Sequence, residues 1–119
     1  MKHAEKILLF VVLTAVSMGC HEKKVDFSAQ VKPILNKRCI SCHGGVKRNG
    51  NFSVLFRKDA LDTTESGKVG IIPGDPAHSE MIRRITSTDP EVRMPYKEPP
   101  LPPEEIDILR RWIQEGAPW

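Results

Sequence analysis

Apolar side chains recur at the spacing of an α-helix in three stretches of the chain, the first of which leads into a pair of neighbouring cysteines. Phe27, Val31 and Leu35 follow one another at intervals of four residues, which places them on one helical face. Asp26 stands directly before them and is a good N-cap residue. We therefore expect a helix that begins after Asp26 and runs into the cysteines, weakened or kinked at Pro33, which lacks a backbone donor.

The other two stretches lie in the second half of the chain. Asp75 and Pro76 are the residue types of an N-cap and a first helical position, so a helix is predicted over about residues 76–86. The last helix is predicted to begin at Pro103 and to end at Gly116. The apolar stripes of these two helices consist of Met81, Ile82 and Ile85 in the first, and Ile106, Leu109, Trp112 and Ile113 in the second.

The segments between the predicted helices are rich in residues that interrupt regular structure. Residues 44–74 contain six glycines and read as a loop with one helical turn at about residues 54–58. Prolines recur through residues 89–103, which favours a stiff, extended loop. Strands would need alternating apolar residues over a useful length, and the sequence has no such run. The pattern predicts an all-α fold of three to four helices joined by long loops.

The N-terminal stretch has the pattern of an export signal. Lys2 and Lys6 precede an apolar run of 11 residues at 7–17, which is short for a membrane-spanning anchor helix but fits the central region of a signal peptide. Cys20 follows a small glycine, as in the lipobox of bacterial lipoproteins, and lipidation there would attach the mature chain to a membrane. Ordinary signal cleavage near Ala15 or Ser17 is the alternative.

This reading divides the chain into three parts. Residues 1–19 are predicted to be a lipoprotein-type signal peptide that is removed, residues 20–25 a short tether, and residues 26–119 one domain. Cys20 would otherwise be an odd thiol in an oxidising compartment, and lipidation would consume it. The expected location is therefore the periplasm, with the protein anchored to a membrane through Cys20.

Composition narrows the classes of function. The chain has 119 residues, of which 18 are basic and 15 acidic, for a formal net charge of +3. Such a balanced charge argues against a nucleic-acid-binding protein. A chain this short, with few aromatic residues, has a modest core, so stabilisation by a cofactor, a metal or a crosslink is expected.

The motif that carries chemistry is Cys-Ile-Ser-Cys-His at residues 39–43. Two thiols separated by two residues match the two vinyl groups of haem, and a histidine directly after the second can reach the iron from one face. Cys39 and Cys42 are therefore predicted to be thioether sites of one covalently attached haem c, with His43 as the proximal iron ligand. Gly44 and Gly45 would let the backbone turn away beside the haem edge.

Two other readings of the cysteine pair remain open, with less support. A structural zinc site needs four nitrogen or sulfur ligands, usually with a second Cys or His pair at similar spacing, and the only histidines of the mature chain besides His43 are His21 and His78. A thioredoxin-like disulfide is expected at the start of a helix between strands, and no strands are predicted here.

The second axial ligand of the iron has four candidates: His21, His78, Met81 and Met94. His21 lies in the tether, and His78 is most simply a solvated residue in the first turn of a helix. Met81 belongs to an apolar helical stripe, where core packing explains it. Met94 has no such explanation, and Pro95 stiffens the loop that holds it, so Met94 is the predicted distal ligand.

Several motifs together resemble a known family. The Cys-x-x-Cys-His motif after an amphipathic helix, the late Met-Pro loop and the closing helix are similar to class I cytochromes c. The segments IIPGDPAHSEMIRRI, STDPEVRMPY and PPEEIDILRRWIQEGAPW more narrowly resemble the planctomycete-type cytochrome c domain, over about residues 25–119. The resemblance implies the class I cytochrome c fold, the haem attachment at Cys39 and Cys42, and the ligand pair His43 and Met94.

The resemblance also implies two contacts. The first and last helices of that fold cross, so Phe27 and Trp112 are expected to meet. In the same fold a proline carbonyl usually accepts the Nδ1 proton of the ligand histidine, and Pro73 is the candidate here.

The predicted function is electron transfer, because an iron with both axial positions filled has no vacant site for a substrate. An acidic redox partner is expected to dock on a basic collar, and haem propionates are expected to pair with Arg83, Arg84 or Arg93. The alternatives are a haem enzyme subunit or a gas or redox sensor with a displaceable distal ligand, and a tethering domain in which haem is structural. The collar consists of Lys32, Lys37, Arg38, Lys47 and Arg48.

Overall fold

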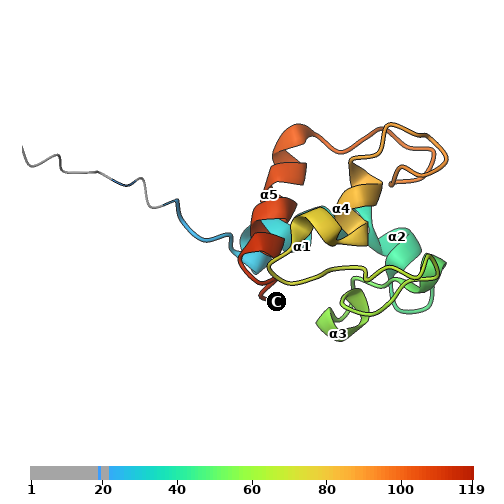
Figure 1. Ribbon diagram of the computed structural model, residues 1–119, viewed down its shortest axis with the longest axis horizontal. Coiled ribbons are helices and arrows are strands. Elements are labelled where there is room, and N and C mark those ends of the chain that lie inside the picture. The colour runs from blue at the N-terminus through green and yellow to red at the C-terminus, as the bar shows by residue number, and fades with distance from the viewer. Residues whose placement is uncertain (1–18, 20–21) are drawn as a thin grey trace, which may run out of the picture.

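The computed structural model describes residue 19 and residues 22–119, so the predicted signal peptide, Cys20 and His21 lie outside the described residues. The described chain is helical, and its β structure is limited to two isolated bridges, His43 with Arg48 and Thr63 with Val69. Figure 1 shows the helices and the long loops that join them. The α-helices are α1 (Lys32–Arg38), α2 (Ile40–His43), α3 (Arg57–Ala60), α4 (Glu80–Ile85) and α5 (Pro103–Gln114). Within the described part, none of the helices has the length and apolar character needed to cross a membrane.

The first helical segment begins as predicted and changes from π-helical to α-helical hydrogen bonding along its length. The carboxylate of Asp26 accepts a hydrogen bond from the backbone N–H of Ala29, which makes it the N-cap. Residues Phe27–Val31 form the π-helix η1, and α1 follows at Lys32 with Pro33 in its first turn. The change from π to α geometry directly before Pro33 agrees with the predicted weakening there, because proline cannot donate to the preceding turn.

The second predicted helix is interrupted, which the sequence pattern did not indicate. Residues Pro76–His78 form the short 3₁₀ helix η3, capped by Asp75, and α4 begins only at Glu80. Ser79 separates the two with extended backbone. Its buried hydroxyl accepts from Ile72 N–H and donates to the carbonyl of Asp75, so side-chain bonding competes with helix continuation at this position.

The remaining segments agree with the prediction apart from one shift. Helix α5 begins at Pro103 and the chain leaves it through Gly116, whose φ of +99° suits glycine. Residues 89–102 contain neither helix nor strand. The helical turn expected at about residues 54–58 lies instead at α3 (Arg57–Ala60), and a second short 3₁₀ helix, η2, spans Asn49–Asn51.

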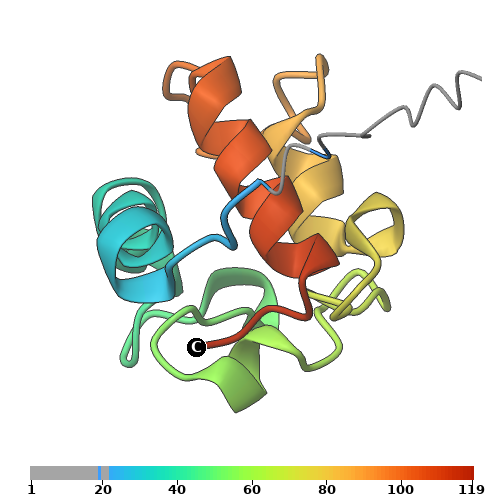
Figure 2. The same ribbon diagram turned by 90° about the vertical axis from the view of Figure 1, so that its left-hand side faces the viewer.

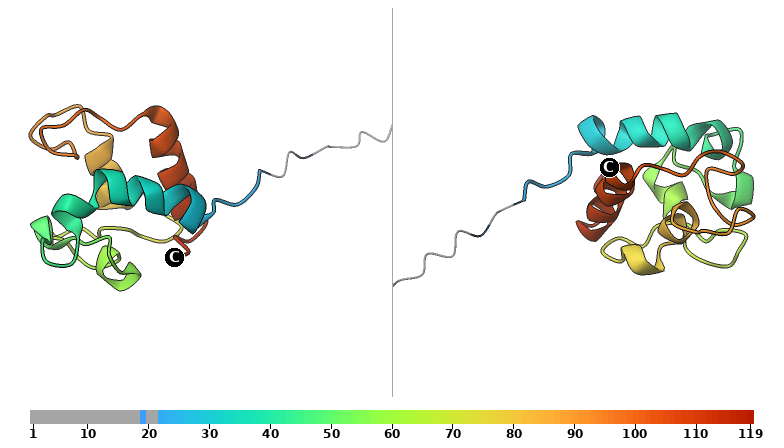
Figure 3. Two further views of the ribbon diagram at one scale, coloured as in Figure 1. Left: turned by 180° about the vertical axis from the view of Figure 1, so that it is seen from behind. Right: turned by 90° about the horizontal axis from the view of Figure 1, so that it is seen from above.

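The helices meet around one apolar core. Figures 2 and 3 show α5 crossing the start of the first helical segment, with the C-terminus beside the point where residues 22–26 enter the fold. The predicted contact between Phe27 and Trp112 is present, with ring centroids 5.8 Å apart, and Trp119 stacks on both rings at 4.7 and 5.4 Å. This aromatic cluster closes one end of the domain, while α2 lies on the other side in Figure 1. Helix α3 lies nearer the C-terminal segment, because Arg57 donates to the carbonyls of Gly116 and Ala117.

Candidate functional site

A cavity of about 500 Å³ brings the predicted site residues together. Cys39, Cys42 and His43 line one part of its wall, and Met94 lines another. Residues that are 51 positions apart in the sequence therefore face one space. Its volume falls in the range of small-molecule and cofactor sites. His78 is not among the lining residues; its ring is exposed and lies 2.8 Å from a carboxylate oxygen of Asp75.

The two cysteines differ in exposure. Cys39 ends α1 and is partly buried, Cys42 lies exposed in α2, and both are free thiols. Burial raises the pKa of the Cys39 thiol to about 12, so this thiol is protonated at neutral pH. The nucleophile of a thiol redox motif has a lowered pKa, so the environment of Cys39 does not suit it to that role.

His43 is held by a hydrogen bond that fixes its tautomer. Its Nδ1 lies 3.1 Å from the carbonyl oxygen of Phe52, to which it donates, and the Phe52 ring meets the imidazole edge-on at 5.3 Å. The prediction of Pro73 as this acceptor was wrong, because the carbonyl that accepts from the His43 ring is that of Phe52. Burial lowers the pKa of His43, so the ring is neutral at neutral pH and Nε2 carries the lone pair that a metal needs.

The backbone after His43 is tightly packed. A Cβ at Gly44 would stand 2.6 Å from the carbonyl oxygen of Ile40, so this position requires glycine. The carbonyl of His43 accepts from Val54 N–H at 2.8 Å, and a Cβ at Gly45 would stand 2.9 Å from Leu55. Residues 52–54 therefore bond both the ring and the backbone carbonyl of the histidine.

Two methionines reach the cavity. Met94 is partly buried and its backbone N–H donates to the carbonyl of Arg84 at 3.0 Å. Met81 also lines the cavity, and it belongs to the buried core with Ile82 and Ile85, as its helical spacing predicted. The structure therefore leaves both thioethers in reach of the cavity, and the choice between them rests on the loop position of Met94.

A buried carboxylate in the cavity wall was not recognised from the sequence. Glu80 begins α4, its side chain is 5% exposed, and it accepts hydrogen bonds from Arg83, Arg84 and Ser66. The Arg83 bonds, followed by those of Arg84, hold the pKa of Glu80 at about 2 despite its burial. A glutamate three and four residues before two arginines looks like an ordinary surface pair, so only the fold reveals that it is buried.

Acidic and histidine residues elsewhere do not form a metal site of their own. Within residues 22–119, no three side chains of His, Cys, Asp or Glu gather closely enough to hold a metal ion. The cavity offers instead the imidazole of His43 and the thioethers of Met81 and Met94, and an imidazole with a thioether is a ligand pair that binds haem iron in cytochromes c.

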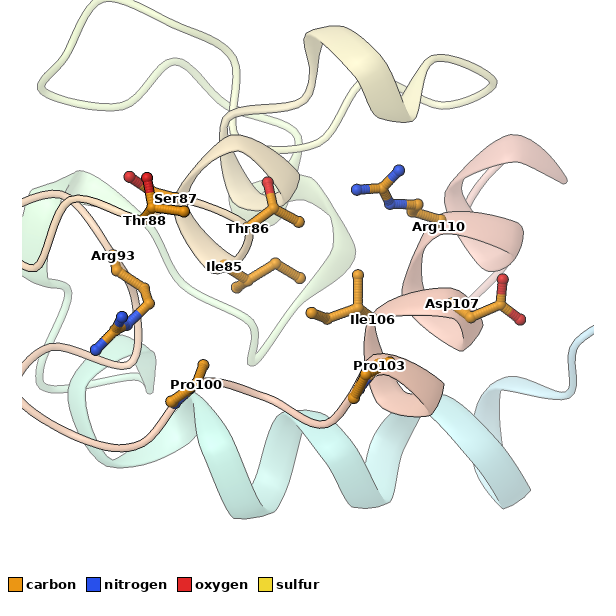
Figure 4. Close-up of a pocket in the computed structure, with 10 residues that line it drawn as sticks. All are labelled: Ile85, Thr86, Ser87, Thr88, Arg93, Pro100, Pro103, Ile106, Asp107 and Arg110. Carbon is orange, nitrogen blue, oxygen red and sulfur yellow. The ribbon is translucent and has the colours of Figure 1, made fainter.

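A second groove, of about 560 Å³, lies between α4, α5 and the proline-rich loop (Figure 4). Arg93 and Arg110 stand on opposite sides of it, and their guanidinium groups do not converge in Figure 4. The Nε of Arg93 is buried without a hydrogen-bond partner. Because Arg93 lines this groove and not the cavity, Arg84 is the one of the three predicted propionate partners that the structure brings to the cavity wall.

Residues 39–98 match the family model described as planctomycete cytochrome C, a span that holds the Cys-x-x-Cys-His motif, α4 and Met94. The chain belongs to the planctomycete cytochrome c family. Membership indicates a haem-binding electron carrier and implies haem c as the cofactor. Among curated proteins and solved structures there is no match to the chain.

Family membership and the geometry agree on where haem would fit. The lining of the cavity includes two thiols, a neutral imidazole, the thioethers of Met81 and Met94, and Arg84, whose guanidinium could pair with a carboxylate. These are the groups that a covalently attached, axially ligated haem needs. The residues present therefore fit the cofactor that the family implies.

Proposed function

We propose that the protein is a mono-haem c-type cytochrome that transfers single electrons, with Cys39 and Cys42 as thioether sites and His43 and Met94 as iron ligands. The observation that carries the proposal is the shared cavity, which the Cys-x-x-Cys-His motif and Met94 both line. When bound, haem c supplies an iron that gains or loses one electron without losing a ligand.

The chain's own residues would supply attachment and orientation. Phe52 fixes the imidazole of His43 through its carbonyl, which keeps Nε2 directed to a metal. The rigid loop of Met94 keeps a weak thioether ligand in place with little entropy to lose. Both axial positions are then filled by protein atoms, which favours electron transfer over substrate chemistry.

The test is a redox titration of the purified holoprotein followed by its absorption spectrum. We expect one reversible one-electron transition, the weak long-wavelength charge-transfer band of methionine-sulfur ligation in the ferric state, and no binding of carbon monoxide at millimolar concentration or below in the ferrous state. A high-spin resting spectrum and ready binding of carbon monoxide would instead support the alternative of an enzyme or a sensor.

Location follows from the sequence of the N-terminus. We propose export to the periplasm and attachment to a membrane through lipidated Cys20, supported by the charged start, the apolar run and the Gly-Cys pair. A diacylated cysteine supplies more than one chain and would hold firmly, whereas a single chain binds reversibly.

The partner proposed for the haem edge is an acidic redox protein. Residues 27–58 contain seven basic residues and no acidic ones, and this basic segment includes the motif. Val46, in the loop after His43, is fully exposed, and Phe56, in the chain that returns past this loop, is 57% exposed. Arg38 and Arg48 of the collar are paired with Glu105 and Asp59, so the proposed docking charge rests mainly on the lysines, which suit a partner with a negative face.

A charge reversal in the basic segment should change the rate of reaction with small charged oxidants. For Lys37→Glu/Lys47→Glu we expect ferricyanide to oxidise the ferrous protein about three- to tenfold more slowly at low ionic strength, because an attractive field becomes weaker. Stopped-flow absorbance gives the rate. Lys24→Glu/Arg110→Glu is the control, because it makes the same change in net charge at two exposed residues that do not line the cavity, and equal slowing in both double variants would contradict docking at the haem edge.

A further inference from the structure

Glu80 is a buried charge in the wall of the cavity, and neither the electron-transfer proposal nor the family match gives it a role. We propose that Glu80 is a positioning residue for the distal ligand: its carboxylate holds Arg84, and the backbone carbonyl of Arg84 holds Met94 in place. This inference rests on the proposed function, since it assumes Met94 as the ligand.

The helix brings Glu80 and its partners to one face. Glu80 is the first residue of α4, and Arg83 and Arg84 follow three and four positions later, one turn along the helix. Of the two arginines, Arg84 lines the cavity together with Glu80, whereas Arg83 does not. The same carboxylate therefore contacts one arginine at the cavity and one away from it.

The carboxylate is fully engaged. Arg83 donates to both oxygens, from Nε to Oε2 at 2.7 Å and from Nη2 to Oε1 at 2.6 Å. Arg84 donates from Nε to Oε1 at 2.9 Å, and the hydroxyl of Ser66 donates to the same oxygen at 3.1 Å. Four donors on a side chain that is 5% exposed hold it in one position.

Arg84 is held at both ends. Its side chain is tied to Glu80, and its carbonyl oxygen accepts the backbone N–H of Met94 at 3.0 Å. The bond to Glu80 uses only Nε, so the two terminal nitrogens stay available to a haem propionate. A displacement of Arg84 would therefore have two effects. It would disturb the backbone bond that supports Met94, and it would move the positive charge that lines the cavity.

Loss of the Glu80 charge should loosen this support. In Glu80→Gln the neutral amide would give up charge-assisted bonds to both guanidinium groups and leave buried donors less well satisfied. Arg84 would then have other positions open to it, and Met94 would lose part of the constraint that keeps it on the iron.

The experiment measures displacement of the distal ligand by imidazole in the ferric holoprotein, followed by loss of the methionine-sulfur band. For Glu80→Gln we expect half-displacement at an imidazole concentration about tenfold lower than in the wild type, the effect of weakening the one charge-assisted bond that reaches Arg84. The control is Glu104→Gln, the same chemical change in the first turn of α5, where the side chain is exposed. It should match the wild type.

A purely structural role for Glu80 makes a different prediction. If Glu80 only stabilised the fold, Glu80→Gln would lower the denaturant midpoint of the holoprotein and leave the imidazole midpoint unchanged. That result would overturn the proposal. If the wild type lacks the methionine-sulfur band altogether, the proposed ligation by Met94 fails first, so the two failures are distinguishable.

Variants of the two arginines give a second test, which can be carried out even where Glu80→Gln does not yield folded holoprotein. Arg84→Lys and Arg83→Lys each keep the positive charge and remove one guanidinium from Glu80. We expect Arg84→Lys to lower the imidazole midpoint severalfold more than Arg83→Lys. Arg84→Lys weakens the side-chain link between Glu80 and the residue whose backbone carbonyl holds Met94, whereas Arg83 neither bonds Met94 nor lines the cavity. Equal effects of the two variants would contradict a route through Arg84.

Discussion

The double variant Cys39→Ser/Cys42→Ser should contain no covalently bound haem. The two thiols are the attachment points that the shared cavity offers, and serine cannot form the thioether bonds. His43 and Met94 alone would hold haem by coordination, which denaturation breaks. Haem staining after denaturing electrophoresis, together with the intact mass, measures the result.

The single variants and the third cysteine sharpen this test. Each single serine variant should keep one thioether, with Cys39→Ser affecting the partly buried site and Cys42→Ser the exposed one. Cys20→Ser should keep the haem and lose the added mass of lipidation. Persistence of covalent haem in the double variant would contradict attachment at the motif, and an unmodified mass at Cys20 would contradict the lipoprotein proposal.

Local signals account for the parts of the fold that the sequence predicted well. Asp26 caps the first helical segment through its own side chain, and Pro103 and Gly116 bound the last helix. Each of these features depends on residues within one helical turn, so residue types alone are sufficient. The buried stripe of α4 follows for the same reason, since helical periodicity shows which residues share a face.

Features that depend on distant parts of the chain were not predictable. The break at Ser79 arises because its hydroxyl bonds the backbone of Ile72, seven residues earlier in the chain. The acceptor for His43 is the carbonyl of Phe52, and a carbonyl carries no sequence signature that separates it from that of Pro73. Burial of Glu80 likewise depends on the turn that brings Ser66 against α4.

The candidate site divides in the same way. The spacing of Cys39, Cys42 and His43 identifies the motif from five consecutive residues. Met94 was selected because a loop methionine lacks the packing explanation that Met81 has. The fold adds that both methionines line one cavity, so sequence and structure together reduce the question to two thioethers that mutation can separate.

Met94→Ala should abolish the methionine-sulfur band of the ferric protein and open the iron to external ligands. Alanine has no donor atom, so the distal position would pass to water or to a ligand such as carbon monoxide in the ferrous state. The potential should fall, because thioether ligation favours the ferrous iron. Absorption spectra and a redox titration of the holoprotein measure all three effects.

Met81→Leu is the matched control, because it removes the other thioether while nearly conserving volume at a core position that is 5% exposed. We expect it to keep the band and the potential, and to cost less than about 1.5 kcal/mol in the free energy of unfolding. Loss of the band in Met81→Leu and its survival in Met94→Ala would assign the distal position to Met81. The ligand would then come from the rigid core helix and not from the proline-stiffened loop, and the Glu80–Arg84 link would lose its target.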